Sequence, residues 1–149
     1  MSMLGITEIL LIEDNADESN LIARILNNHA NNIHITQIND GLKVLDYLYK
    51  KDAYKNCKTP SLILLDLNLP GKDGRELLKE IKTEDKFKHI PVIVLTNSED
   101  YSDVLDSYDH YVNAYITKST DFDKFNKDMM VFKDFWLNGV MLPSSMELD

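Results

Sequence analysis

Acidic residues follow two of the most hydrophobic short runs of the chain. The run Leu62–Leu65 is entirely apolar and is followed at once by Asp66, and the run Glu8–Ile12 is followed by Glu13 and Asp14. Carboxylates brought close together repel one another unless a cation lies between them, and their oxygen atoms suit a hard divalent ion, Mg²⁺ above all. A carboxylate beside Mg²⁺ can attack a phosphoryl group while the ion offsets the developing charge. These residues therefore indicate a metal-assisted phosphoryl-transfer site.

Two residues that follow later apolar runs fit the same chemistry. Thr96 follows Val92–Leu95, and Lys118 follows Ala114–Thr117. A lysine ammonium is a compact positive charge for phosphate oxygens, and a threonine hydroxyl can donate a hydrogen bond to one of them. Together with Asp66 as the nucleophile, Thr96 and Lys118 form a candidate catalytic set.

Each of these residues also has an ordinary explanation. Asp66 could be a solvated loop residue, and Glu13 and Asp14 could cap the helix that follows them. Thr96 could begin the next helix, and Lys118 could be a surface lysine. The functional interpretation depends on all of them meeting at one edge of the fold.

The elements that must position these residues alternate between short apolar runs and amphipathic segments. Short runs that are apolar on both faces are typical of buried parallel strands, and apolar residues at helical spacing predict the helices between them. The expected strands are Glu8–Ile12, Ile33–Ile38, Leu62–Leu65, Val92–Leu95 and Ala114–Thr117, and the expected helices are Asp17–His29, Leu42–Tyr49, Arg75–Lys82, Glu99–Tyr111 and Asp121–Met141.

This alternation predicts an α/β fold with a doubly wound, five-stranded parallel sheet of order 2-1-3-4-5, the flavodoxin-like (βα)₅ arrangement. In that order the first and third strands are neighbours. Ligands of such sheets bind beyond the carboxyl ends of the strands. The acids after the first and third strands should therefore crowd one edge of the sheet, with Thr96 and Lys118 beside them.

Length and composition limit the other possibilities. The 149 residues predict a single domain over 1–149, with a core at about 7–140 and a flexible tail at about 143–149. A net charge of −9 disfavours nucleic-acid binding, and Cys57, the single cysteine, leaves no internal disulfide. The chain lacks both a membrane-spanning apolar run and a signal-peptide start, so we expect a soluble, cytoplasmic protein.

Residues 7–140 resemble the receiver domains of two-component response regulators. The resemblance rests on Glu13-Asp14 after the first strand, Asp66 within LLDLNLPGKDG, Thr96 after the fourth strand and Lys118 after the fifth. It implies that Asp66 accepts a phosphoryl group from a histidine kinase, with Thr96 and Lys118 assisting. It also implies Mg²⁺ as the cofactor, held by the acidic pair and Asp66.

Two further residues match the receiver pattern by position. Tyr115 lies three residues before Lys118, where receivers often carry an aromatic that changes rotamer on activation, so Thr96 and Tyr115 are the expected switch. Asn68 matches the position whose backbone carbonyl ligates the metal. The resemblance further implies that the protein catalyses only its own phosphoryl acceptance and hydrolysis, and is otherwise not an enzyme.

A narrower resemblance is to the small single-domain response regulators that are paired with phytochrome-type histidine kinases and dimerise. It rests on the long insert before the third strand, on HIPVIVLT and on the ending DFWLNGVMLP. One departure follows Lys118, because receivers usually have a proline there with a cis peptide bond and this chain has Ser119. The bond is therefore either cis at an energetic cost or trans with a re-routed loop.

The last expected helix, Asp121–Met141, carries more apolar residues than one core-facing stripe requires. The stripe expected to face the sheet consists of Phe122, Phe125, Met129, Phe132 and Trp136. The surplus predicts a self-association surface, unless the MLPSSM segment folds back over it. The residues expected at a homodimer contact are Met130, Val131, Phe135, Leu137 and Met141.

The function that best fits is a single-domain response regulator of a phosphorelay, which signals through protein contacts. A phosphatase with an aspartyl-phosphate intermediate would need an acid two residues after Asp66, where Asn68 stands. A flavin-binding relative would need a glycine- and hydroxyl-rich phosphate loop where this chain has EDNADES. A receiver fold that acts as a phosphorylation-independent interaction module stays open because of Ser119.

Overall fold

The computed structural model describes residues 5–28 and 32–143, and it confirms the predicted sheet. Five parallel strands lie in the order β2-β1-β3-β4-β5. The strands are β1 (Thr7–Ile12), β2 (Ile33–Ile38), β3 (Leu62–Leu65), β4 (Val92–Thr96) and β5 (Ala114–Thr117). The helices are α1 (Ala16–Asn27), α2 (Gly41–Leu48), α3 (Gly74–Thr83), α4 (Tyr101–Asp109) and α5 (Phe122–Lys133), with a 3₁₀ turn η1 (Asp52–Tyr54) before β3 and a π-helical turn η2 (Asp134–Gly139) after α5.

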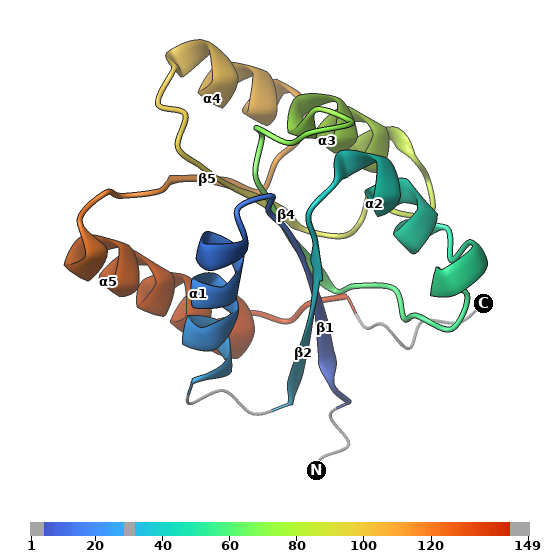
Figure 1. Cartoon of the computed structure of the whole chain (residues 1–149), viewed down its shortest axis with the longest axis horizontal. Helices are drawn as coiled ribbons and strands as arrows, with labels where there is room; N and C mark the ends of the chain where they lie inside the picture. The colour runs from blue at the N-terminus through green and yellow to red at the C-terminus, as the bar shows by residue number, and fades with distance from the viewer. Residues whose placement is uncertain (1–4, 29–31, 144–149) are drawn as a thin grey trace.

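Helices cover both faces of the sheet, which explains why its strands are apolar on both sides. Helices α1 and α5 lie together over one face, and α2, α3 and α4 lie on the other (Figure 1). Alternate residues of β3 point to opposite faces, so Ile63 and Leu65 pack with α2 and α3 while Leu62 and Leu64 pack with α1 and α5. All four residues of β3 are fully buried, which makes this central strand a rigid support for the residue that follows it.

The register of the sheet brings the carboxyl ends of the strands together. Ile12 of β1 is paired with Leu65 of β3, so Glu13 and Asp66 leave the sheet side by side. On the other side of β3, Thr96 of β4 is paired with Thr117 of β5, which places Lys118 one residue beyond that pair. The edge predicted from the sequence therefore exists as a continuous feature of the sheet.

The last helix is where the structure departs most from the prediction. The regular α-helix ends at Lys133 and continues as the π-helical turn η2, so the helical segment ends at Gly139 rather than at Met141. Phe125, Met129 and Phe132 are buried against the sheet as predicted, but Phe122 is exposed. Phe122 is the first residue of α5 and is 60% exposed, so it does not belong to the stripe that packs on the sheet.

Two of the residues predicted for a dimer surface instead belong partly to the core. Met130 and Leu137 are half-buried and pack against the α1–α5 core, whereas Val131, Phe135 and Met141 are exposed. The predicted tail, 143–149, lies outside the described residues apart from Pro143, and so do Ser144, Ser145 and Met146 of the MLPSSM segment. Within 5–28 and 32–143, the structure has no helix with the length and apolar character that crossing a bilayer requires.

Candidate functional site

Backbone hydrogen bonds hold the residues that follow the strands in fixed positions. The amide of Glu13 donates to the carbonyl of Ile38, and the amide of Asp66 donates to the carbonyl of Ile12, each at 3.0 Å. The amide of Lys118 donates to the carbonyl of Thr96 at 2.8 Å. Each residue is thus attached to the neighbouring strand as well as to its own, so the side chains begin from a rigid edge.

Three carboxylates meet at this edge. Glu13, Asp14 and Asp66 each offer an oxygen atom, and these oxygens all lie within 4.8 Å of one another. Glu13 and Asp66 are buried and Asp14 is exposed, so the cluster opens to solvent on one side. Such a donor set suits a hard divalent cation that keeps some of its water ligands.

Asn15 caps helix α1, and neither Glu13 nor Asp14 does. The side chain of Asn15 accepts a hydrogen bond from the Glu18 amide at 3.0 Å, while the amide of Asn15 donates to Glu13 Oε2 at 3.1 Å. The capping role that was an alternative for the acidic pair is therefore taken by the next residue, and both acids remain available to the site.

Lys118 is the cation at the centre of the site. Its Nζ lies 2.5 Å from Glu13 Oε1, 2.6 Å from Glu18 Oε1 and 3.2 Å from Asp66 Oδ2. The side chains of Lys118, Glu13 and Asp66 are buried, whereas Glu18 lies at the rim. Lys118 is therefore a buried charge that several partners compensate, and not a surface lysine.

The electrostatics of the site follow from three acids around one ammonium. Burial raises the pKa of Glu13 to about 7, with the charge of Asp66 acting in the same direction and the hydrogen bond from Lys118 acting against it. Burial alone would lower the pKa of Lys118, but its hydrogen bonds to Glu13 and Glu18 outweigh that effect and raise the pKa above its usual range. The ammonium therefore stays charged, and a further cation would relieve the remaining negative charge.

Thr96 and Tyr115 lie on the side of the site next to β4. Thr96 is the last residue of β4 and does not begin a helix, and it is fully buried. Its hydroxyl accepts a hydrogen bond from the Ser98 amide at 3.4 Å. The hydroxyl of Tyr115 donates to the Ser98 carbonyl at 2.9 Å, so both residues contact the same loop after β4.

The two remaining positions from the sequence pattern also have clear geometry. The amide of Asn68 donates to Asp66 Oδ1 at 3.1 Å, and the Asn68 side chain is exposed. The peptide bond between Lys118 and Ser119 is trans, since the described residues contain no cis peptide bond. The Lys118 ammonium nevertheless reaches Asp66, because its long side chain spans the distance.

The structure adds residues that the sequence reasoning did not single out. Glu18 joins the site from the first turn of α1, three residues after the N-cap residue Asn15. Arg75 of α3 binds Asp103 of α4 through two hydrogen bonds of 2.7 and 2.8 Å, and Asp103 also accepts a 2.6 Å hydrogen bond from the Ser98 hydroxyl. The only sequence signal for these residues was their charge, because they lie far apart along the chain.

Comparisons with known proteins agree with this geometry. The family described as response regulator receiver domain matches residues 9–129. The response regulator Rcp1 of a Synechocystis strain is 42% identical over 137 residues, which cover 92% of this chain and 93% of Rcp1.

Two solved structures share the whole fold. The phosphorylated cyanobacterial phytochrome response regulator RcpA superposes with a TM-score of 0.90 at 41% identity, over 94% of this chain and 100% of that one. The Mn²⁺-bound form of Rcp1 superposes with a TM-score of 0.89 at 42% identity, over 93% of this chain and 99% of that one. These two proteins therefore share the fold of the chain described above.

Proposed function

This chain belongs to the response regulator receiver family, and from that premise we propose that a histidine kinase phosphorylates it on Asp66. The observation that carries the proposal is the position of Asp66, which lies with Glu13 and Asp14 in one acidic cluster and 3.2 Å from the Lys118 ammonium. The similarity to a phytochrome response regulator supports a phytochrome-type kinase as the phosphoryl donor. The match over residues 9–129 supports a single receiver domain.

Asp66 is the nucleophile in this proposal. One carboxylate oxygen attacks the phosphorus of the kinase phosphohistidine, and the phosphorus–nitrogen bond breaks with its electron pair going to the histidine nitrogen. The product is an acyl phosphate on Asp66. Lys118 then binds one phosphoryl oxygen through its ammonium, and the hydroxyl of Thr96 donates a hydrogen bond to another.

The residues at this edge fit a divalent cation, and we assign Mg²⁺ to it. The carboxylates of Glu13, Asp14 and Asp66 and the backbone carbonyl of Asn68 would hold the ion. When bound, Mg²⁺ neutralises the negative charge that develops on the transferring phosphoryl group. The existence of an Mn²⁺-bound form of Rcp1 supports a divalent metal in this family of sites.

Phosphorylation would act on the loop after β4. Thr96 and Tyr115 both contact Ser98, so a hydroxyl of Thr96 drawn toward a phosphoryl group would move the loop to which Tyr115 is bonded. Because the chain is a response regulator and not a conventional enzyme, we propose that its output is a change in protein contacts.

The test is the melting temperature with Mg²⁺ and beryllofluoride, a phosphoryl mimic. A ligand that binds only the folded state raises the melting temperature, and saturation at a hundredfold excess over Kd corresponds to about 5–10 °C for a domain of this size. We expect this rise in the wild type and its loss in Asp66→Asn.

The matched control is Asp85→Asn, which removes a carboxylate from the exposed ion pair with Lys88, away from the site. This variant should respond as the wild type does. If the wild type showed no rise, the phospho-acceptor assignment would be overturned, and a phosphorylation-independent interaction module would be the remaining function.

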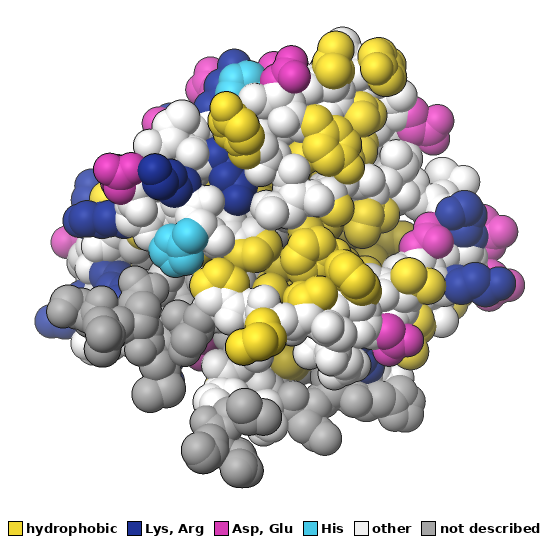
Figure 2. Space-filling model, turned by 180° about the vertical axis from the view of Figure 1, so that it is seen from behind, with side chains coloured by type: hydrophobic (Ala, Val, Ile, Leu, Met, Phe, Trp, Pro, Cys, Tyr) yellow, Lys and Arg dark blue, Asp and Glu magenta, His cyan; other side chains and the backbone are white. Residues whose placement is uncertain are grey.

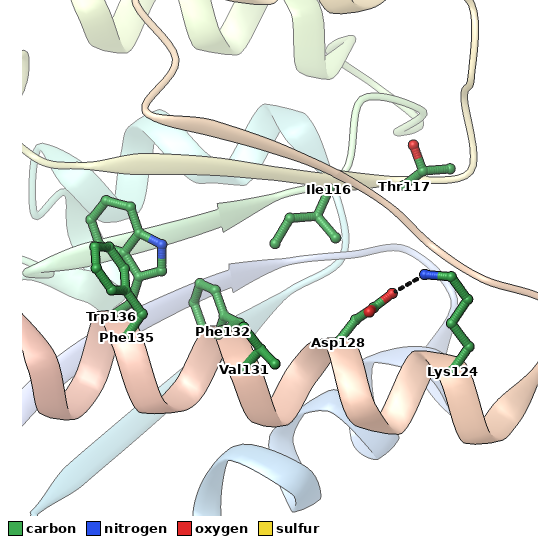
Figure 3. A pocket seen from close by; sticks show the side chains of 8 residues that line it. All are labelled: Ile116, Thr117, Lys124, Asp128, Val131, Phe132, Phe135 and Trp136. Carbon is green, nitrogen blue, oxygen red and sulfur yellow. Dashed lines mark hydrogen bonds and ion pairs between the residues drawn. The ribbon is translucent and has the colours of Figure 1, made fainter.

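We also propose that the surface beside α5 mediates homodimer formation. Hydrophobic side chains form a broad area across the face of the molecule opposite to the view of Figure 1 (Figure 2). A groove of about 490 Å³ lies between β5 and the α5–η2 segment. Its lining includes Ile116 of β5, Val131 and Phe132 of α5, and Phe135 and Trp136 of η2 (Figure 3).

A second copy of this chain is the proposed occupant of the groove, because it would bring the same exposed apolar side chains to it. Val131 and Phe135 expose apolar side chains beside the groove, which could insert into the groove of a symmetry-related copy. Lys124 and Asp128 lie at the other end of the groove, joined by a 2.8 Å ion pair, and in a twofold contact each could pair with its opposite across the interface.

A further inference from the structure

Glu18 is the one partner of Lys118 that the receiver pattern does not account for. Its Oε1 atom lies 2.6 Å from the Lys118 Nζ atom, closer than the 3.2 Å between that nitrogen and Asp66 Oδ2. Glu18 lies in the first turn of α1, where its amide donates to the Asn15 side chain, so its backbone is fixed relative to the site. The contact is therefore part of the folded structure of this edge.

The three carboxylates use the whole donor capacity of Lys118. An ammonium group has three N–H donors, and Nζ has three carboxylate partners within hydrogen-bond distance, Glu13, Glu18 and Asp66. A phosphoryl oxygen that needs the ammonium must therefore displace one of them.

Solvent exposure identifies which partner can leave. The side chains of Glu13 and Asp66 are 2% and 6% exposed, whereas that of Glu18 is 38% exposed. A carboxylate that rotates into water keeps its hydration, whereas a buried one would lose its partner without gaining water. Displacing Glu18 is accordingly the least costly exchange.

We infer that Glu18 is a positioning residue that holds the Lys118 ammonium in the unphosphorylated protein and competes with the phosphoryl group for it. The inference rests on the function proposed above. A phosphoryl group carries up to two negative charges, so Glu18 also opposes it by repulsion at short range. Glu18 thereby lowers the affinity of the site for a phosphoryl group without being a metal ligand.

The experiment compares two affinities in each variant, that for beryllofluoride at saturating Mg²⁺ and that for Mg²⁺ alone. Glu18→Gln removes the charge but keeps the length of the side chain, and Glu18→Ala removes both charge and hydrogen bond. We expect beryllofluoride to bind about twofold to fivefold more tightly in both variants, and the affinity for Mg²⁺ alone to change by less than about twofold.

Asp17→Asn is the matched control, because Asp17 is an exposed acid in the same helical turn. It loses the same favourable charge at the helix N-terminus but should leave the beryllofluoride affinity unchanged. The inference would be overturned if Glu18→Gln and Asp17→Asn had the same affinity for beryllofluoride. It would also be overturned if Glu18→Gln bound beryllofluoride more weakly than the wild type does. Absence of any beryllofluoride binding in the wild type would instead overturn the proposed function, so the two failures are distinguishable.

Discussion

The guanidinium of Arg75, in the first turn of α3, binds both carboxylate oxygens of Asp103, in the first turn of α4. Asp103 also accepts a hydrogen bond from the Ser98 hydroxyl, and the Ser98 carbonyl accepts one from Tyr115. The loop that follows Thr96 is thus connected to α3, α4 and β5 by a continuous set of polar contacts. This loop is the one whose movement we propose to carry the phosphorylation signal.

The Arg75–Asp103 pair should contribute measurably to stability. Asp103 is 15% exposed, so Arg75→Met leaves a largely buried carboxylate that keeps its hydrogen bond from the Ser98 hydroxyl but loses its charged partner. We expect the free energy of unfolding, measured by urea denaturation, to fall by about 1–3 kcal/mol. The control Lys88→Met breaks the exposed pair with Asp85 and should cost less than about 0.5 kcal/mol. Equal losses in the two variants would contradict the prediction.

The same pair predicts a pH dependence. Hydrogen bonds from Arg75, and then from Ser98, lower the pKa of Asp103 from its usual 3.8 to about 2. Because the pKa in the folded state is the lower one, this stabilisation is present above about pH 4 and is lost as the pH falls toward 2, for a total of about 1–2 kcal/mol. Urea denaturation between about pH 5 and pH 3 should therefore show a shallower loss of stability for Asp103→Asn than for the wild type. If the free energy of unfolding fell equally with pH in the wild type and in Asp103→Asn, Asp103 would be excluded as a contributor to the pH dependence.

Gly74 is required by its contact with the backbone of Asp66. A Cβ atom at Gly74 would lie 2.3 Å from the Asp66 carbonyl oxygen and 2.6 Å from the Leu67 Cα atom, and neither can move without moving the nucleophile. We expect Gly74→Ala to lower the free energy of unfolding by about 1–3 kcal/mol and to weaken the response to beryllofluoride. Gly139→Ala is the control, since the nearest atom would be 3.3 Å away. A wild-type response in Gly74→Ala would show that the backbone adapts.

The Tyr115 hydroxyl should hold the loop after β4. Tyr115→Phe removes its hydrogen bond to the Ser98 carbonyl, at an expected cost of about 0.5–1.5 kcal/mol. The physical consequence is a more mobile loop, so hydrogen exchange of the Ser98 and Asp100 amides should become faster. Tyr108→Phe removes the hydroxyl of an exposed tyrosine and serves as the control. Unchanged exchange in Tyr115→Phe would mean that Asp103 alone holds the loop.

The dimer surface can be tested without disturbing the core. Val131 and Phe135 are 64% and 56% exposed, so the double variant Val131→Glu/Phe135→Glu should fold normally. If these side chains lie between two copies, the charges should abolish dimerisation in sedimentation experiments, because buried unpaired carboxylates are strongly unfavourable. Leu42→Glu changes an equally exposed apolar residue on α2, and this variant should sediment with the mass of the wild-type dimer. A dimer that persists in the double variant would place the contact elsewhere.

The sequence was sufficient to predict the fold and to predict which residues lie at the acidic edge of the sheet. Strands such as Leu62–Leu65 are apolar on both faces, which only a sheet covered on both sides explains, and helical spacing separates them. Once that topology is assumed, Glu13, Asp14, Asp66, Thr96 and Lys118 must meet, because parallel strands end at the same edge. This conclusion needed no side-chain coordinates. The structure brings Glu13, Asp14, Asp66 and Lys118 close together, and it places Thr96 at the end of the neighbouring strand β4.

Only the tertiary structure decided which charged side chains bind one another. Sequence spacing does not show that Glu18 reaches Lys118, that Arg75 binds Asp103, or that the bond before Ser119 is trans. Nor does it show that Met130 and Leu137 turn partly into the core, since a helical stripe is assigned to a face only when its neighbours are known. Local patterns determine which elements form, because periodicity acts over a few residues. Pairing between distant charges depends on packing distances of a few ångströms, which only the assembled fold determines.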